Sequence, residues 1–230
     1  QFAGAVETLT LDIDDTTSFA DLVFDASTTA VTIDAGANFT VATTLTNAGV
    51  KTYTVSGSGT VDLDAVALGA AATTYDASTA TGVQSILVGA TNTTVTTGTA
   101  NDVVDMAGNL NSSDTIDLGD GTDTLRVDID GLSAGSADLS ISNVETLRLD
   151  NTGANNGAIQ MDNLAVTTVR LDEGTARGGA LTLTDIATTI TAFTMTGAGT
   201  ASGDPQFNAV NVDYDTSTTQ SNATLTISNG

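Results

Sequence analysis

Short segments in which two apolar residues enclose one polar residue recur along this 230-residue chain. Such alternation is typical of a short β-strand that buries one face. Asp, Ser, Thr or Asn usually follows the second apolar residue. In the N-terminal part the segments begin at 22-residue intervals, at Leu9-Thr10-Leu11, Val31-Thr32-Ile33 and Tyr53-Thr54-Val55.

Two further series share this period but differ in phase. The arginine series consists of Leu125-Arg126-Val127, Leu147-Arg148-Leu149, Val169-Arg170-Leu171 and, 24 residues later, Phe193-Thr194-Met195. The second series consists of Ile116-Asp117-Leu118, Leu139-Ser140-Ile141, Ile159-Gln160-Met161 and Leu181-Thr182-Leu183, and we assign to it Val210-Asn211-Val212 and Leu225-Thr226-Ile227 as later members. Two strand phases with one period mean that each repeat contributes at least two strands.

A parallel β-solenoid (β-helix) is the simplest fold with this pattern. We therefore predict an all-β chain in which strands of successive 22-residue coils stack roughly 4.8 Å apart. A β-sandwich, or a mixture of the two folds, also contains short alternating strands but does not require a constant period. We treat residues 1–230 as one domain with irregular loops, belonging to a larger protein or assembly. Residues 56–100, where Val61-Asp62-Leu63 and Ile86-Leu87-Val88 fall out of phase, are expected to form an irregular break.

Three arginines occupy the same place in successive repeats. Arg126, Arg148 and Arg170 would stack on the outward face of a solenoid, which alone is an unfavourable column of like charges. An Asp follows each of them two residues later, on the same face: Asp128, Asp150 and Asp172. We expect two columns of opposite sign that form a solvated surface network of small energetic value, rather than a catalytic basic cluster.

Charge narrows the possible partners. Five basic residues face 28 acidic ones, and the formal net charge is −23. This excludes nucleic acid, whose binding requires Lys and Arg, and disfavours an anionic membrane surface. It favours divalent cations, which prefer carboxylate and carbonyl oxygens. A hydrophobic content of 40% argues against the disorder that such a charge would otherwise suggest. No run of 18 apolar residues is present, so no membrane insertion is expected.

One acidic, glycine-containing stretch resembles the nonapeptide of the RTX family, Gly-Gly-x-Gly-x-Asp-x-apolar-x. Residues 118–126 match it except that Leu118 stands in place of the first Gly, and residues 97–105 and 109–117 are degenerate copies. Gly allows a tight turn that turns carbonyls towards an ion, and Asp supplies an anionic oxygen. The candidate calcium-binding residues are Asp102, Asp105, Asp114, Asp117, Gly119, Asp120, Gly121 and Asp123.

Calcium needs six to eight oxygens, so one turn must be completed by a second turn one coil away. Asp102 and Asp120 are 18 residues apart, as are Asp105 and Asp123. That spacing equals two nonapeptides, and we expect these pairs to be stacked. The alternative is that the turns are ordinary Asp-Gly surface turns without an ion.

The missing residue types argue against an enzyme. The chain contains no His, no Cys and no Trp, only five basic residues and three Tyr. A nucleophilic triad, a thiolate metal site and an aromatic sugar platform are therefore unavailable. Parallel β-helices that degrade polysaccharides remain the enzymatic alternative, because a pair of carboxylates is possible in a chain this rich in Asp.

The solenoid pattern, the degenerate nonapeptides, Asp123-Thr124-Leu125 and residues 143–147 together resemble the RTX-type surface-layer (S-layer) proteins of Gram-negative bacteria. The resemblance implies an extracellular structural protein on the bacterial surface, secreted unfolded and assembled with calcium into a lattice with copies of itself. A cell-surface polysaccharide is a further candidate partner. The two structural alternatives are a repeat domain of a large adhesin, stiffened by calcium, and the subunit of an extracellular filament.

Overall fold

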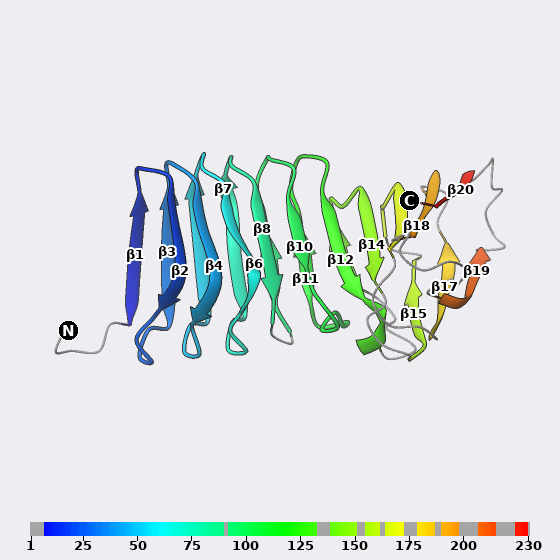
Figure 1. Ribbon diagram of the computed structural model, residues 1–230, viewed down its shortest axis with the longest axis horizontal. Coiled ribbons are helices and arrows are strands. Elements are labelled where there is room, and N and C mark those ends of the chain that lie inside the picture. The colour runs from blue at the N-terminus through cyan, green and yellow to red at the C-terminus, as the bar shows by residue number, and fades with distance from the viewer. Residues whose placement is uncertain are drawn as a thin grey trace. The chain divides into compact units, whose positions relative to one another are not determined.

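The computed structural model describes residues 7–89, 92–132, 139–150, 155–161, 164–172, 179–186, 190–197, 207–214 and 224–229. Within these ranges, short strands stack in parallel about 22 residues apart and form a β-solenoid (Figure 1). The predicted fold class is therefore confirmed. One 3-10 turn, η1 (Ile129–Gly131), is the single helical element of the described residues. None of these residues belongs to a helix long and apolar enough to cross a membrane.

The chain divides into two compact units, of which the first comprises Gln1–Asp105 and Ser113–Asp123. The chain alternates between two parallel sheets in this unit. One sheet has the order β1 (Thr8–Ile13), β3 (Ala30–Ala35), β5 (Thr52–Gly57), β7 (Thr74–Ala80), β9 (Thr94–Thr96) and β11 (Thr115–Asp117). The other has the order β2 (Thr17–Val23), β4 (Phe39–Thr46), β6 (Val61–Leu68), β8 (Gln84–Val88) and β10 (Val103–Asp105).

The register of the first sheet follows the predicted spacing. Leu9 lies opposite Val31, and Val31 lies opposite Tyr53. The apolar residues of each alternation point inward, and Val31 and Val55 are each only 1% exposed. Full burial of such a side chain contributes about 1.5–3 kcal/mol. A coil is consequently stabilised mainly by the coils on either side of it.

The expected break across residues 56–100 is not present in the part that the structure describes. β6, β7, β8 and β9 continue the two sheets of the first unit through this stretch. The segments were out of phase because the strands contain register shifts, for example between Leu63 and Ala67. The residues around Gly69–Ala72, an Ala-rich stretch, form a turn in which the Ala72 N–H donates to the Gly69 carbonyl (2.8 Å).

The second unit comprises Met106–Ser112 and Thr124–Gly230. One run of neighbouring strands has the order β12 (Thr124–Asp128), β14 (Thr146–Asp150), β16 (Thr168–Asp172), β18 (Ala192–Gly197) and β20 (Thr224–Asn229). A three-stranded sheet has the order β15 (Gly157–Gln160), β17 (Gly179–Ile186) and β19 (Phe207–Tyr214), and β13 spans Ser140–Ser142.

Both series of the C-terminal part are recovered in this unit, with one correction. Leu125, Leu147, Val169 and Phe193 lie opposite one another in β12, β14, β16 and β18. Val210-Asn211-Val212 lies opposite Leu181-Thr182-Leu183, as the second series predicts. Leu225 lies opposite Phe193, however, so Leu225-Thr226-Ile227 continues the arginine series and its assignment to the second series was wrong.

Candidate functional site: the acidic turns and the arginine column

The three nonapeptide-like segments place their Asp residues in different surroundings. Asp102, Asp114 and Asp123, which hold the motif's single Asp position, are buried, with exposed fractions of 0–2%. Asp105 and Asp117 are half-buried at the ends of β10 and β11. The turn residues Asp120 and Gly121 are exposed, and Gly119 is half-buried.

Each buried carboxylate accepts a hydrogen bond from a main-chain N–H of the preceding coil. Asp102 Oδ1 accepts from Gln84 N at 2.7 Å, and Asp123 Oδ1 accepts from Asp102 N at 2.6 Å. Asp114 Oδ1 accepts from Thr93 N at 2.7 Å. Three of the predicted metal ligands thus already satisfy protein donors with one oxygen each.

The turns stack, but not at the predicted spacing. The Asp120 N–H donates to the Gly98 carbonyl (2.9 Å), and the Thr122 N–H donates to Asn101 Oδ1 (2.9 Å) across 21 residues. Asp102 therefore lies beside Asp123, and the expected pairs Asp102–Asp120 and Asp105–Asp123 were wrong. The physical reason is that coil length changes within the motif, from 18 residues between Gln84 and Asp102 to 21 residues between Asp102 and Asp123.

Gly119 makes the close stacking of the two turns possible. Its φ of +77° is one that residues with a Cβ rarely adopt, and a Cβ there would lie 2.0 Å from the Gly98 carbonyl oxygen. Its N–H donates to Asp117 Oδ1 (3.2 Å), so this carboxylate caps the turn. Leu118, which replaces the first Gly of the motif, is fully buried in the core.

The described residues do not assemble a calcium shell. No three acidic side chains among them are close enough together to hold a metal ion. One oxygen, Asp102 Oδ2, is buried without a hydrogen-bond partner, and a cation could approach it. A single oxygen is far from the six to eight that calcium requires. The residues of these turns therefore do not fit a bound calcium ion in the arrangement seen.

Burial dominates the electrostatics of Asp102. It raises the pKa of this carboxyl above the usual value of 3.8, and the hydrogen bond from Gln84 N partly offsets the rise. Burial also raises the pKa of Tyr75, to which the negative charge of Asp102 adds. Because the pKa of Asp102 is raised, its contribution to stability is complete in acid and decreases as the pH rises through the raised value.

A buried polar chain inside the first unit was not predicted. Asn47 Nδ2 donates to the Tyr53 hydroxyl (2.9 Å), and the rings of Tyr53 and Tyr75 lie 6.3 Å apart. The Tyr75 hydroxyl donates to Gln84 Oε1 (2.8 Å), and Gln84 Nε2 donates to the Gly82 carbonyl (2.7 Å). The signal in the sequence was Tyr at the same place in two successive repeats, followed by a Gln in a position that is apolar in β4 and β6.

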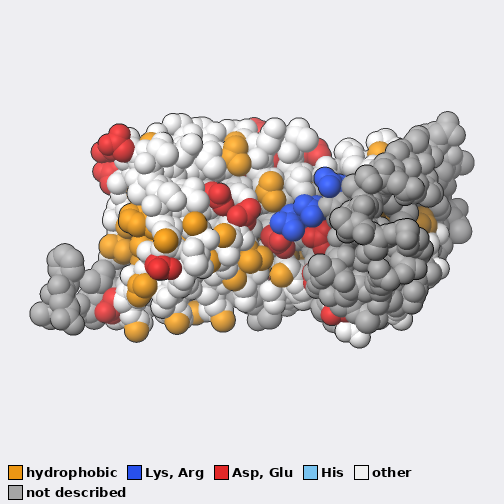
Figure 2. All heavy atoms as spheres, in the orientation of Figure 1, with side chains coloured by type: hydrophobic (Ala, Val, Ile, Leu, Met, Phe, Trp, Pro, Cys, Tyr) orange, Lys and Arg blue, Asp and Glu red, His pale blue; other side chains and the backbone are white. Residues whose placement is uncertain are grey.

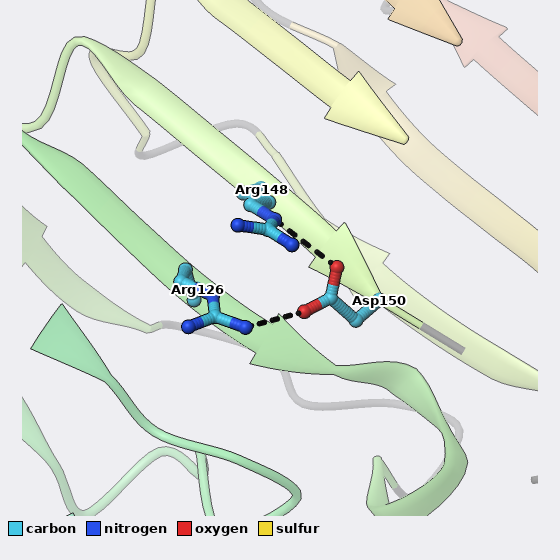
Figure 3. A network of polar contacts seen from close by, with 3 residues as sticks. All are labelled: Arg126, Arg148 and Asp150. Carbon is cyan, nitrogen blue, oxygen red and sulfur yellow. Dashed lines mark hydrogen bonds and ion pairs between the residues drawn. The ribbon is translucent and has the colours of Figure 1, made fainter. Parts of the chain in front are cut away.

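The arginine column has the predicted arrangement. Arg126 lies opposite Arg148 and Arg148 opposite Arg170 on β12, β14 and β16. Asp150 bridges two of them, with Oδ2 3.2 Å from Arg126 Nη2 and Oδ1 3.2 Å from Arg148 Nε (Figure 3). Basic side chains gather in one patch on the face drawn in Figure 2, with acidic side chains beside them. The two bridged arginine side chains are 27% and 29% exposed, so each ion pair is worth little.

The fold and these contacts define the class of protein as a parallel β-solenoid with acidic turns. Comparison with protein-family models, with curated proteins and with solved structures gave no match for the chain. Its function is therefore argued from the residues and the fold.

Proposed function

We propose that this chain is a structural, non-catalytic part of an extracellular protein that assembles with copies of itself into a surface layer on a Gram-negative bacterium. The observation that carries the proposal is how its polar side chains are used. They tie one coil to the next, as in the bonds from Thr60 N to Asn38 Oδ1 (3.0 Å) and from Ser56 Oγ to Asp34 Oδ1 (3.0 Å). Side chains that hold a stack together suit a load-bearing element better than a reaction site.

Calcium enters the proposal as a counter-ion of the assembly. A net charge of −23 makes copies repel one another, and a divalent cation between acidic surfaces lowers that repulsion. The exposed Asp120 and the half-buried Asp105 and Asp117 belong to this role, in place of a preformed intramolecular shell. A cell-surface polysaccharide is the proposed attachment partner, and neither nucleic acid nor membrane insertion has a part.

Electron microscopy of the purified protein tests the proposal, with millimolar calcium and with EGTA at equal ionic strength. Ordered sheets that form with calcium and dissolve in EGTA are the expected result. Threads would replace the surface layer by the filament alternative. Single particles under both conditions would leave the adhesin domain as the better reading. Release of reducing ends from acidic or neutral polysaccharides would overturn the non-catalytic assignment.

A magnesium arm and a salt arm separate specific from general effects of charge. If sodium chloride at matched screening assembles the protein as well as calcium does, the divalent ion has no special place in the assembly. If magnesium fails where calcium succeeds, the larger and more flexible coordination of calcium is required.

A further inference from the structure

We infer that Asp102 and Asp123 are register staples: side chains that take over a coil-to-coil hydrogen bond from the main chain at the point where the solenoid changes coil length. The inference concerns how the first unit folds and does not depend on self-assembly. It assigns to the single Asp of the nonapeptide-like motif a role that needs an acceptor oxygen and no ion.

The main-chain pattern of the preceding coils sets the baseline. At one position of β2, β4 and β6 the main-chain N–H donates to a carbonyl of the next coil. Thr17 N donates to Asn38 O, and Phe39 N donates to Thr60 O, both at 2.8 Å. Val61 N donates to Val83 O, also at 2.8 Å. In each case the acceptor belongs to the residue just before the opposite member of the next strand.

The next two coils keep the donor but change the acceptor. Gln84 lies opposite Val61, and its N–H bonds to Asp102 Oδ1 rather than to a carbonyl. The Asp102 N–H in turn bonds to Asp123 Oδ1. Both carboxylates are at most 1% exposed. The substitution coincides with coils of 18 and 21 residues, whereas the coil from Val61 to Val83 keeps a separation of 22.

A side-chain acceptor explains why the coil length can change here. A carbonyl acceptor fixes the position of the main chain that carries it, whereas a carboxylate reaches the same donor from a Cα that lies further away. The strand can therefore re-enter the sheet earlier without leaving a buried N–H unsatisfied, which would be costly. Asp114, which accepts from Thr93 N, supplies the same kind of bond to the other sheet across 21 residues.

Neutral amides perform similar bonds elsewhere in the chain. Asn38 accepts from Thr60 N, Asn101 from Thr122 N (2.9 Å) and Asn156 from Ala180 N (2.8 Å), each from one coil to the next. These bonds run in the opposite sense along the chain, but the chemistry is the same. The staple therefore requires an oxygen acceptor and does not require the negative charge that a calcium ligand would supply.

The test compares Asp102→Asn with Asp102→Ala in the full chain, followed by native-state hydrogen exchange at the Gln84 amide in EGTA and in millimolar calcium. Asp102→Asn keeps an acceptor and should retain the protection of this amide in both solutions. Asp102→Ala removes the acceptor, and the protection should fall roughly tenfold or more because a buried donor loses its partner. The control pair Asp120→Asn and Asp120→Ala, at an exposed residue of the same motif, should change nothing at Gln84.

Other results would overturn the staple. If Asp102→Asn loses protection as Asp102→Ala does, the charge is required. If it abolishes a calcium-dependent rise in protection, Asp102 is an ion ligand. Should Asp102→Ala fail to fold, Asp123→Asn with exchange read at the Asp102 amide tests the same claim, and loss of protection there would contradict it. A failure of self-assembly would leave all these outcomes unaffected.

Discussion

Removing one hydroxyl from the buried polar chain tests whether Tyr75 and Gln84 stabilise the first unit as a pair. Both residues are fully buried, and the hydroxyl donates to Gln84 Oε1 at 2.8 Å. Tyr75→Phe keeps the ring and its packing against Tyr53, so it opens almost no cavity. It leaves the Gln84 oxygen buried without a donor, and we expect a loss of about 1–3 kcal/mol in the free energy of unfolding.

The reverse change should cost a similar amount, for a matching reason. Gln84→Met keeps the length of the side chain but leaves the Tyr75 hydroxyl without its acceptor. It also removes the donor to the Gly82 carbonyl. The double variant has neither unsatisfied partner, so its loss should be smaller than the sum of the two single losses by about 1–3 kcal/mol.

Urea unfolding followed by far-ultraviolet circular dichroism measures this cycle, provided that the dependence on urea is the same in all four proteins. For a chain of this size, 1 kcal/mol shifts the midpoint of thermal unfolding by about 2–4 °C, so Tyr75→Phe should lower it by about 2–12 °C. Strictly additive losses would show that the two groups do not interact. An unchanged Tyr75→Phe would show that the oxygen of Gln84 finds water instead.

Three further predictions follow from individual contacts. Gly59→Ala would place a Cβ 2.0 Å from a main-chain oxygen of the preceding coil and should cost about 1–3 kcal/mol in urea unfolding, whereas Gly36→Ala, with its nearest contact at 3.3 Å, should cost much less. Asp150→Asn removes two half-exposed ion pairs and should change stability by less than about 1 kcal/mol, with the difference vanishing in high salt. Burial raises the pKa of Tyr53 and Tyr75 above the usual 10.0, so their stabilisation is complete below about pH 10 and is lost as the pH rises further; pH-dependent unfolding of the double Phe variant should show a weaker alkaline loss, and an equal loss would contradict this.

The fold was accessible from the sequence because a solenoid repeats its geometry at a fixed interval. Leu9, Val31 and Tyr53 share a register position, and their 22-residue spacing reports it directly. Interruptions were harder to interpret, since a register shift moves the pattern without ending the sheet. The shift between Leu63 and Ala67 therefore looked like a break in the solenoid.

The turns were only partly accessible, for a different reason. The motif identified the correct residues, because its Asp position coincides with the three buried carboxylates, Asp102, Asp114 and Asp123. Burial and hydrogen-bond partners depend on which turns stack. An assumed coil of 18 residues paired Asp102 with Asp120, whereas the chain pairs it with Asp123. The sequence alone does not reveal that a carboxylate accepts a main-chain N–H that a carbonyl accepts in earlier coils.

These two uses of Asp explain how a chain with a net charge of −23 can hold a stacked fold. The buried carboxylates are few, and each of the three gives an oxygen to a main-chain donor, which offsets part of the cost of its burial. The exposed carboxylates keep their water and act on other molecules or ions. A count of Asp residues in such motifs therefore overestimates the number of ion ligands, because residues at the motif's own Asp position are committed to the fold before any ion arrives.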